Sequence, residues 1–330
     1  MPAIGRWRMA AAITLVAGLT IWASALADGS PPPAPSASGL PRLSVKAATH
    51  PRRVLAARPS HLLVVVEENH SFEQVIGSPA APFLNRLAAH GTLLTHYHAI
   101  AHPSLPNYVA VLSGRTGRIR SDCLQCTISG PTLVDQLESH HISWAAYLQG
   151  LPRPCSTVAS AGAYTALVDP FMHAADIRHH PTRCDRVLPF SRFQRDLAAD
   201  RLPRVVFVMP DLHHEMHSGP VRVADAWLRR LVGRLRASRA WRQDTRLVVT
   251  FDESRLSDVR SCCDGLGRGG RILTVVAGPR VPEGRDPTPY THYSLLRSLE
   301  AAFGLPLLGH AGDPATATIP AVAGRPRGLA

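Results

Sequence analysis

In the run Val64-Val65-Val66-Glu67-Glu68-Asn69-His70-Ser71-Phe72, a series of branched apolar residues ends abruptly in acids, an amide and an imidazole. Val-rich runs are typical of the buried strands of parallel sheets, and open α/β sheets place their chemistry just beyond the carboxyl ends of those strands. Burying Glu68 and Asn69 without partners would cost several kcal/mol. We therefore expect a cation, or a dense hydrogen-bond network, beside these two residues.

A second apolar run has the same ending. Leu247-Val248-Val249-Thr250-Phe251 leads directly into Asp252-Glu253. Two strands that finish in carboxylates predict one acidic cluster at one edge of the sheet. Carboxylate and amide oxygens bind hard divalent cations, and they also bind zinc. The alternative for each pair is a solvated helix N-cap, and this alternative is weaker for both pairs taken together.

A third segment, Ala101-His102-Pro103-Ser104-Leu105-Pro106-Asn107-Tyr108, lies between a predicted strand and an apolar helical run. Ser104 falls at the strand-to-helix turn, where its hydroxyl can be exposed and where backbone N–H groups can hold an anion. A serine hydroxyl needs a base or a metal to become a good nucleophile. Taken alone, Ser104 reads as a helix cap. Beside an acidic metal cluster, the nucleophile interpretation is favoured.

Four ordered motifs together resemble the phosphoesterase family of the alkaline phosphatase superfamily, which groups bacterial phospholipases C with bacterial and fungal acid phosphatases. The motifs are Glu68-Asn69-His70-Ser71-Phe72, His102 to Tyr108, Asp252-Glu253 and Thr291-His292-Tyr293-Ser294. The resemblance runs from about His61 to Phe303. The Ser-Leu-Pro-Asn-Tyr version and the short chain are closer to the acid phosphatases.

The resemblance implies a role for each matching residue. The expected metal ligands are Glu68, Asn69, Asp252 and Glu253; the expected catalytic residues are Ser104 as the phosphorylated nucleophile, His217 and His292; and the expected substrate-binding residues are Asn107 and His102. The family often has His-Asn-Pro-Phe where this chain has Val168-Asp169-Pro170-Phe171, which leaves the substrate preference open.

The expected cofactor is a divalent metal cation whose identity the sequence leaves open. Such an ion would activate Ser104 and neutralise charge on the transferred phosphoryl group. Because acidic ligands for only one ion are evident, we hypothesise that His217 and His292 act as imidazolium ions, which predicts activity in acid to neutral conditions. The chain has 17 histidines, so a few near any loop are expected by chance.

The first residues predict export. Arg6 and Arg8 precede an uncharged apolar stretch from Met9 to Trp22, and Ala25-Leu26-Ala27 resembles a cleavage site. This pattern is typical of a secretory signal peptide over residues 1–27 and predicts a secreted or extracellular protein. An uncleaved membrane anchor is the alternative. The predicted domain order continues with a disordered Pro/Ala/Ser/Arg-rich segment (28–60), a catalytic domain (61–310) and a C-terminal tail (311–330).

Six cysteines in an exported chain favour disulfides. Cys155 with Cys184 is the preferred pair, and Cys123 with Cys126 could close a tight loop. The partners of the adjacent Cys262 and Cys263 stay open. The Cys-x-x-Cys spacing of Cys123 and Cys126 could also indicate a zinc or redox site. The sequence shows neither a second such pair nor a thioredoxin-like context to support that role.

The formal charge of +12 comes almost wholly from arginine. This excess favours anionic partners and is compatible with peripheral contact to anionic surfaces. No DNA- or RNA-binding motif is evident, so no specific nucleic-acid partner is expected. A solvated, solubilising charge is the preferred interpretation. The oligomeric state is left open.

Alternating strands and helices predict an α/β fold with a mostly parallel sheet covered by helices on both faces, and the family resemblance implies that this fold is alkaline phosphatase-like. The predicted strands are 61–67, 92–100, 143–148, 204–209, 246–251 and 271–277, and the predicted helices are 82–90, 105–112, 132–139, 224–237 and 293–302. The Gly-rich run 265–270 precedes a strand, which predicts a flexible loop near the site and no dinucleotide fingerprint.

The preferred function is a secreted metal-dependent phosphomonoesterase of acid phosphatase type, working through a phosphoserine on a small-molecule or lipid phosphate ester, phosphoinositides included. A phospholipase C-type phosphodiesterase is the first alternative. A serine carboxylic-ester hydrolase is the second, since Ser104, Asp252 and His292 occur in a suitable order, but the Gly-x-Ser-x-Gly elbow is missing. A non-catalytic surface-binding protein is the third.

Overall fold

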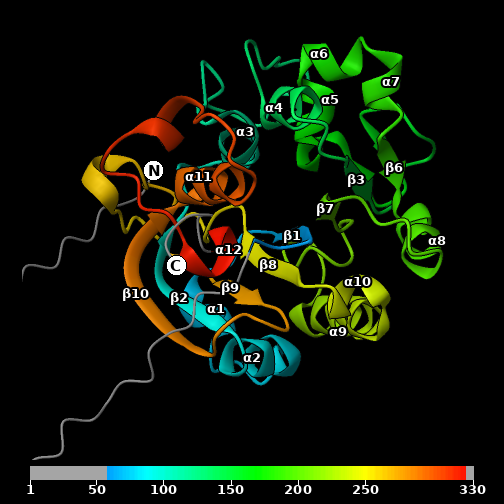
Figure 1. The fold of residues 1–330 in the computed structure, drawn as a ribbon. Coiled ribbons are helices and arrows are strands. Elements are labelled where there is room, and N and C mark those ends of the chain that lie inside the picture. Colours follow the sequence, from blue (N-terminus) through cyan, green and yellow to red (C-terminus); the bar gives the residue numbers. More distant parts are fainter. Residues whose placement is uncertain (1–57, 325–330) are drawn as a thin grey trace, which may run out of the picture. The chain divides into compact units, whose positions relative to one another are not determined.

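Eight strands form the central sheet of this computed structural model, which describes residues 58–324, in the order β10-β2-β9-β8-β1-β7-β3-β6 (Figure 1). Only β9 runs antiparallel to its neighbours in this sheet. The α/β class and the mostly parallel sheet predicted from the sequence are therefore confirmed. The strands are β1 (His61–Glu67), β2 (Thr92–His98), β3 (Trp144–Leu148), β6 (Val187–Pro189), β7 (Val205–Met209), β8 (Thr245–Phe251), β9 (Thr274–Ala277) and β10 (Gly284–Thr291).

The middle of the sheet is buried on both faces, as the apolar runs predict. Every residue of β7 and β8 is buried, and in β1 only His61 is not. β1 lies between β8 and β7 and pairs in parallel with both. These strands therefore end at one common edge of the sheet.

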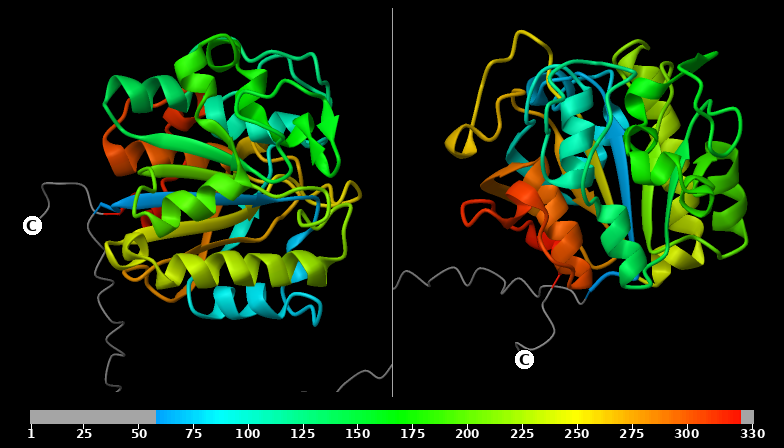
Figure 2. Two further views of the ribbon diagram at one scale, coloured as in Figure 1. Left: turned by 90° about the vertical axis from the view of Figure 1, so that its right-hand side faces the viewer. Right: turned by 90° about the horizontal axis from the view of Figure 1, so that it is seen from above.

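Helices cover both faces of the sheet (Figure 2). α3 (Leu105–Ser113) and α11 (His292–Phe303) pack together on one face, and α2 (Pro82–Ala89) and α9 (Val221–Ala237) on the other. The remaining elements are α1 (Phe72–Val75), α4 (Leu133–Ser139), α5 (Pro170–His173), α6 (Ala175–Arg178), α7 (Pro181–Cys184), α8 (Phe190–Ala198), α10 (Arg239–Arg242), α12 (Pro320–Ala323), the 3₁₀ turns η1 (Ala166–Val168), η2 (Cys263–Gly265) and η3 (Gly309–Gly312), and the hairpin of β4 (Ser160–Ala161) and β5 (Tyr164–Thr165).

The predicted leader over residues 1–27 lies outside the described residues, as do most of the segment 28–60 and residues 325–330. Residues 311–324, which we assigned to a tail, pack back onto the domain. α12 contacts α11, and Ile319 and Val322 are fully buried. Within residues 58–324, no helix combines the length and the apolar character needed to cross a bilayer.

All six cysteines form disulfides. The pairs Cys155–Cys184 and Cys123–Cys126 are those predicted from the sequence. The remaining pair joins the neighbours Cys262 and Cys263.

The Gly-rich run 265–270 is packed against the loops around it, which differs from the flexible loop that we predicted. A Cβ atom at Gly269 would clash with the carbonyl oxygen of Ala101, and one at Gly270 would clash with Oγ of Ser254. Gly270 also has a φ of 73°, which favours glycine. These glycines let two loops approach each other closely beside the carboxyl edge of the sheet.

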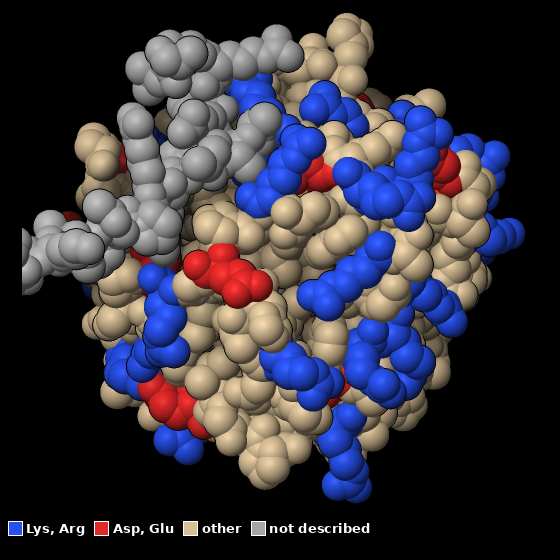
Figure 3. Space-filling model, turned by 60° about the horizontal axis from the view of Figure 1, so that its bottom comes forward, with Lys and Arg blue, Asp and Glu red and all other residues tan. Residues whose placement is uncertain are grey.

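The basic character of the chain is spread over its surface. Figure 3 shows one face on which Lys and Arg side chains far outnumber Asp and Glu. On α9, the outward residues are mostly arginines, while Trp227, Leu228 and Leu231 face the core. A broad distribution of this kind keeps a protein soluble and raises its affinity for anionic surfaces in general.

Candidate active site

The two acidic pairs predicted from the sequence lie side by side at the carboxyl ends of β1 and β8. β1 and β8 are paired along their whole length, from His61 opposite Thr245 to Glu67 opposite Phe251. The residues that follow each strand therefore meet. The backbone N–H of Asn69 donates to Oδ1 of Asp252 at 3.2 Å. Asn69 has a φ of 54°, a left-handed conformation that asparagine tolerates well.

Ser104 lies between these two pairs. It directly precedes α3, at the end of the loop that follows β2, and it is 6% exposed. Its Oγ is 3.3 Å from Oδ1 of Asn69 and 3.2 Å from Oε1 of Glu253, so its single hydrogen points to one of these two oxygens. Among the residues described, no histidine hydrogen-bonds this hydroxyl. The base nearest to Ser104 is thus a carboxylate.

The first turn of α3 offers no free cradle for an anion, which differs from our expectation. The N–H of Leu105 donates to Oδ1 of Asp122 at 2.9 Å, and the N–H of Asn107 donates to the carbonyl of Ser104 at 2.9 Å. Pro106 has no N–H. The positive charge that a phosphoryl group requires must therefore come from another source.

Asn107 is expected to bind substrate, but its amide is fully used inside the protein. It is completely buried; its Oδ1 accepts from the N–H groups of Ile100 and Ala101, and its Nδ2 donates to the carbonyls of Ala101 and Pro103. These contacts hold the loop before Ser104 in shape, and the expected contact of Asn107 with a phosphoryl oxygen stays a prediction.

His102, the other expected substrate-binding residue, is also held by internal contacts. Its Nδ1 pairs with Oε2 of Glu253, and its Nε2 lies 3.2 Å from the carbonyl oxygen of Asp258. The hydrogen bond with Glu253 raises the pKa of His102 above its ordinary value. Because both ring nitrogens have partners, His102 is placed to orient Glu253 toward Ser104, and its expected substrate-binding role stays a prediction.

His292 is completely buried behind Asp252. Its Nε2 lies 2.6 Å from the carbonyl oxygen of Asp252, and its Nδ1 lies 3.2 Å from the Tyr97 hydroxyl. A neutral ring satisfies both contacts by donating from Nε2 and accepting at Nδ1. Burial lowers the pKa of His292 to about 4. Burial therefore disfavours the imidazolium form of His292, and its expected catalytic role stays a prediction.

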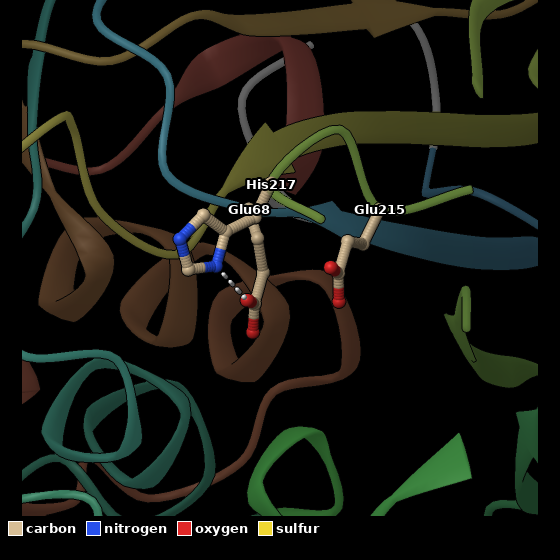
Figure 4. A group of neighbouring side chains, drawn as sticks. All are labelled: Glu68, Glu215 and His217. Carbon is tan, nitrogen blue, oxygen red and sulfur yellow. Dashed lines mark ion pairs between the residues drawn. The ribbon is translucent and has the colours of Figure 1, made fainter. Parts of the chain in front are cut away.

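The loop after β7 adds the carboxylate of Glu215, a neighbour of His217 to which the sequence analysis gave no role. Glu215 and His217 approach Glu68, and one ligand atom from each of the three lies within 4.8 Å of the others (Figure 4). Nδ1 of His217 is 3.5 Å from Oε2 of Glu68. Oε1 of Glu215 accepts from the N–H of Ser218 at 2.9 Å, while its Oε2 has no hydrogen-bond partner. The buried strand Val205–Met209 followed by a His- and acid-rich loop was the signal that could have identified Glu215.

The buried carboxyls of this cluster repel one another. Burial, with the neighbouring charges of Glu68 and Glu253, raises the pKa of Asp252 well above its ordinary value. Burial, with the charge of Glu68, also raises the pKa of Glu215. The hydrogen bond with Glu68 also raises the pKa of His217, which favours the positively charged form of its ring. The site thus carries more negative charge than its own side chains neutralise.

This donor set fits bound divalent cations. Oδ2 of Asp252 and Oε2 of Glu215 are buried without a hydrogen-bond partner in the described chain, and such oxygens are costly to bury unless something binds them. Glu68, Glu215 and His217 have ligand atoms within 4.8 Å of one another, and Asp252 lies beside them, bonded through its Oδ1 to the backbone N–H of Asn69. The acidic cluster is therefore a candidate metal-binding site.

Comparison with known proteins agrees with this geometry. The sequence model of the Phosphoesterase family matches residues 78–306, which include Ser104, Asp252 and His292. A phosphatidylinositol-3-phosphatase of Mycobacterium tuberculosis is 35% identical over 255 residues, which are 76% of this chain and 79% of that protein. A phosphate-repressible acid phosphatase of Penicillium chrysogenum is 32% identical, over 73% of this chain and 58% of that protein. The chain thus spans under two thirds of the fungal relative.

Solved structures share the fold. A protein of the alkaline phosphatase superfamily from Vibrio parahaemolyticus superposes with a TM-score of 0.53 at 14% identity, over 79% of this chain and 72% of that one. A phosphonate monoester hydrolase of Agrobacterium radiobacter also gives a TM-score of 0.53 at 14% identity, over 83% and 79% of the two chains. These structures confirm the alkaline phosphatase-like fold.

Proposed function

Because the chain belongs to the phosphoesterase family, we propose that it is a metal-dependent phosphomonoesterase of acid phosphatase type that works through a phosphoserine at Ser104. The observation that carries the proposal is the placement of the Ser104 hydroxyl, within 3.3 Å of oxygens of both Asn69 and Glu253, in a buried acidic cluster. For this hydroxyl to attack a phosphoryl group, the phosphoryl group must bind next to the carboxylates that surround Ser104.

The charge of the site supports metal dependence. A phosphate monoester is a dianion near neutral pH, and the buried acids of the cluster would repel it. The N–H groups of Leu105 and Asn107 in the first turn of α3 are already bonded. His292, with a pKa of about 4, is neutral near neutral pH. A bound divalent cation would neutralise the transferred phosphoryl group and favour the ionised form of the attacking hydroxyl. We expect Glu68, Asn69, Asp252 and Glu253 to hold it.

The remaining steps belong to side chains of the chain itself. Oε1 of Glu253 is placed to accept the Ser104 proton, and His102 fixes the orientation of that carboxylate from the other side. His217 is 54% exposed, and its pKa is raised by Glu68, so its imidazolium form can face an incoming phosphate at the mouth of the site. Attack by Ser104 forms the phosphoserine and releases the alcohol, and water then releases phosphate from Ser104.

We propose phosphoinositides or other lipid phosphates as the substrate class. The support is the mycobacterial relative, which is named a phosphatidylinositol-3-phosphatase and which the chain covers over 79% of its length. We also propose that the protein is exported. The predicted leader and the three disulfides support this, because disulfides persist in oxidising compartments.

The alternatives have weaker support. A phospholipase C-type phosphodiesterase would use the same nucleophile and differs in the leaving group. For a serine carboxylic-ester hydrolase, His292 would need to contact Ser104, but its two nitrogens contact Asp252 and Tyr97 instead. The geometry therefore disfavours the carboxylic-ester alternative.

The test is phosphate release from an aryl phosphate monoester and from the corresponding diester, with chelator and with divalent cation restored, for the wild-type protein and Ser104→Ala. We expect cation-dependent monoester hydrolysis that Ser104→Ala abolishes, and a phosphorylated Ser104 peptide in acid-quenched wild-type samples by mass spectrometry. Full activity in chelator would exclude the metal role. Diester hydrolysis exceeding monoester hydrolysis would establish the phosphodiesterase alternative.

A further inference from the structure

The loop that follows Glu253 presents two aliphatic side chains to solvent beside the active site. Leu256 is 77% exposed and Val259 is 82% exposed, more than any other large apolar residue in the described chain. Figure 2 shows the yellow-gold loop after β8, which contains both residues, projecting from the body of the domain. A single exposed leucine is ordinary, whereas two strongly exposed aliphatic side chains in one projecting loop are a candidate contact surface.

The loop is rigid enough to present these side chains. The N–H of Asp258 donates to the carbonyl of Arg255 at 2.8 Å, which closes a turn with Leu256 and Ser257 at its tip. Asp258 is buried, and its carboxylate binds Arg260. The exposed side chains thus stand on an ordered turn whose base is fixed.

The position of the turn relative to the site is fixed as well. The carbonyl of Asp258 accepts from Nε2 of His102, whose other ring nitrogen pairs with Glu253. Ser104 Oγ lies 3.2 Å from the same Glu253 carboxylate. A surface that receives Leu256 and Val259 would therefore be held next to the nucleophile.

Other exposed apolar residues collect at the same edge of the sheet. Leu124 lies in the segment whose Asp122 bonds the start of α3, Val158 follows β3, and Val223 begins α9, and each is about 40% exposed. Leu307, at 42%, is the exception; it follows α11, which starts at the carboxyl edge and runs away from it. Leu124, Val158 and Val223 thus lie in segments that follow or precede elements at the carboxyl edge of the sheet.

The charge of the loop indicates which surface it fits. Residues 254–271 carry four arginines and two aspartates; Arg260 and Arg271 form ion pairs with Glu73, and Arg260 also pairs with the buried Asp258. Exposed Arg255 and Arg268 accompany the aliphatic pair. Aliphatic side chains among arginines match the acyl boundary and anionic headgroups of a phospholipid bilayer.

We propose that the Leu256–Val259 turn docks onto an anionic phospholipid bilayer and brings the site to lipid phosphate headgroups. This proposal rests on the proposed phosphatase activity. The turn enters the boundary between headgroups and acyl chains, while the arginines contact phosphates. Docking adds nothing to the chemistry at Ser104, so a soluble monoester should be hydrolysed equally well with or without the turn.

The experiment uses the full chain with the substitutions Leu256→Ser and Val259→Ser together, and Leu307→Ser as the matched control at the opposite edge. Binding to phosphatidylcholine vesicles with and without phosphatidylserine is measured by sedimentation. Hydrolysis of phosphatidylinositol 3-phosphate in vesicles is compared with hydrolysis of a soluble aryl phosphate. Because burying one leucine side chain accounts for about a tenfold gain in affinity, the double variant should bind anionic vesicles at least about tenfold more weakly.

In the supporting result, the double variant loses vesicle binding and activity on the vesicle lipid, keeps its rate on the soluble ester, and Leu307→Ser behaves as wild type. Leu256→Trp provides an independent reading, since its fluorescence should shift to the blue on anionic vesicles. Unchanged vesicle binding by the double variant overturns the proposal, and so does a wild-type protein that ignores vesicles. If the wild type is an oligomer and the double variant is a monomer, the turn mediates self-association and the membrane proposal is overturned. If the wild-type protein does not hydrolyse the soluble ester, the proposed function is refuted, but the vesicle-binding measurement still tests the docking proposal.

Discussion

Replacing Glu215 by Gln removes one carboxylate from the pair that Glu215 forms with Glu68, and it should stabilise the protein when no cation is present. The amide oxygen of the glutamine can still accept from the N–H of Ser218, as Oε1 of Glu215 does at 2.9 Å. Its NH₂ group would take the place of Oε2, which has no hydrogen-bond partner. That group can donate to Glu68, so a repulsion becomes a hydrogen bond.

The size of the effect follows from the distance between the two carboxyls. Their ligand oxygens lie within 4.8 Å. With an effective dielectric constant of about 20, two unit charges at this distance repel by about 3 kcal/mol. Partial protonation of Glu215, whose pKa is raised by burial and by Glu68, and the His217 ring 3.5 Å from Glu68 reduce this value. We expect Glu215→Gln to raise the free energy of unfolding by about 1–3 kcal/mol in chelator at pH near 8.

The assay is urea unfolding without reductant, in chelator and in saturating divalent cation. Wild type should gain stability from the cation, and Glu215→Gln should gain less because it has lost a ligand. Glu300→Gln is the matched control. Glu300 is also fully buried with one oxygen unpartnered, but it lies about 12 Å along α11 from His292. It should leave the response to cation unchanged. Equal stability of Glu215→Gln and wild type in chelator, with equal gains from cation, would refute the reasoning.

Three further outcomes follow from single contacts. Ser104→Ala should lower phosphatase activity by about 10³-fold or more while changing the free energy of unfolding by less than about 1 kcal/mol, because the hydroxyl makes one hydrogen bond at a time; a loss under tenfold would contradict the nucleophile assignment. Burial raises the pKa of Glu300 to about 8, so its contribution to stability is fully present below pH ~4.5 and is lost as pH rises through 8. The stability of Glu300→Gln relative to wild type should therefore increase by roughly 4 kcal/mol between pH 5 and pH 9, and a constant difference would argue against it. Replacing both Cys155 and Cys184 by Ser should cost about 2–4 kcal/mol in urea unfolding, since the bridge closes a loop with a sequence separation of 29, and an unchanged midpoint would contradict a structural role.

Most of the sheet could be predicted because its central strands are buried on both faces. The predicted strand 61–67 has the same bounds as β1. The predicted strand 246–251 corresponds to β8, which begins one residue earlier, at Thr245. The edge strand β10 was missed, since Gly284, Pro287 and Pro289 are read as loop residues in any sequence. An edge strand tolerates proline because one of its sides needs no ladder hydrogen bonds. That strand depends on its pairing with β2, which sequence periodicity does not record.

The candidate site could be predicted where polar residues directly end an apolar strand. Glu68, Asn69, Asp252 and Glu253 follow this pattern, and the structure brings them together around Ser104. Glu215 lies several residues beyond its strand, so only the path of the loop brings it to Glu68.

The internal partners of the polar loop residues could not be predicted either. Asn107 and His102 look like substrate ligands in the sequence because they are polar and lie next to the nucleophile. Which hydrogen-bond partners they find depends on how the loops fold over one another.

The neutral state of His292 changes how an acid to neutral pH preference can arise. That preference was predicted from imidazolium charge, but His292 has a pKa of about 4 because it is buried. The groups with raised pKa values are the carboxyls of Asp252 and Glu215, and His217 beside Glu68. Asp252 is one of the residues expected to hold the cation and Glu215 lies beside Glu68, another of them, so protons and cation compete for carboxylate oxygens of this cluster. Lowering the pH should therefore act first by weakening cation binding, and the pH range of activity should widen toward acid as the cation concentration rises.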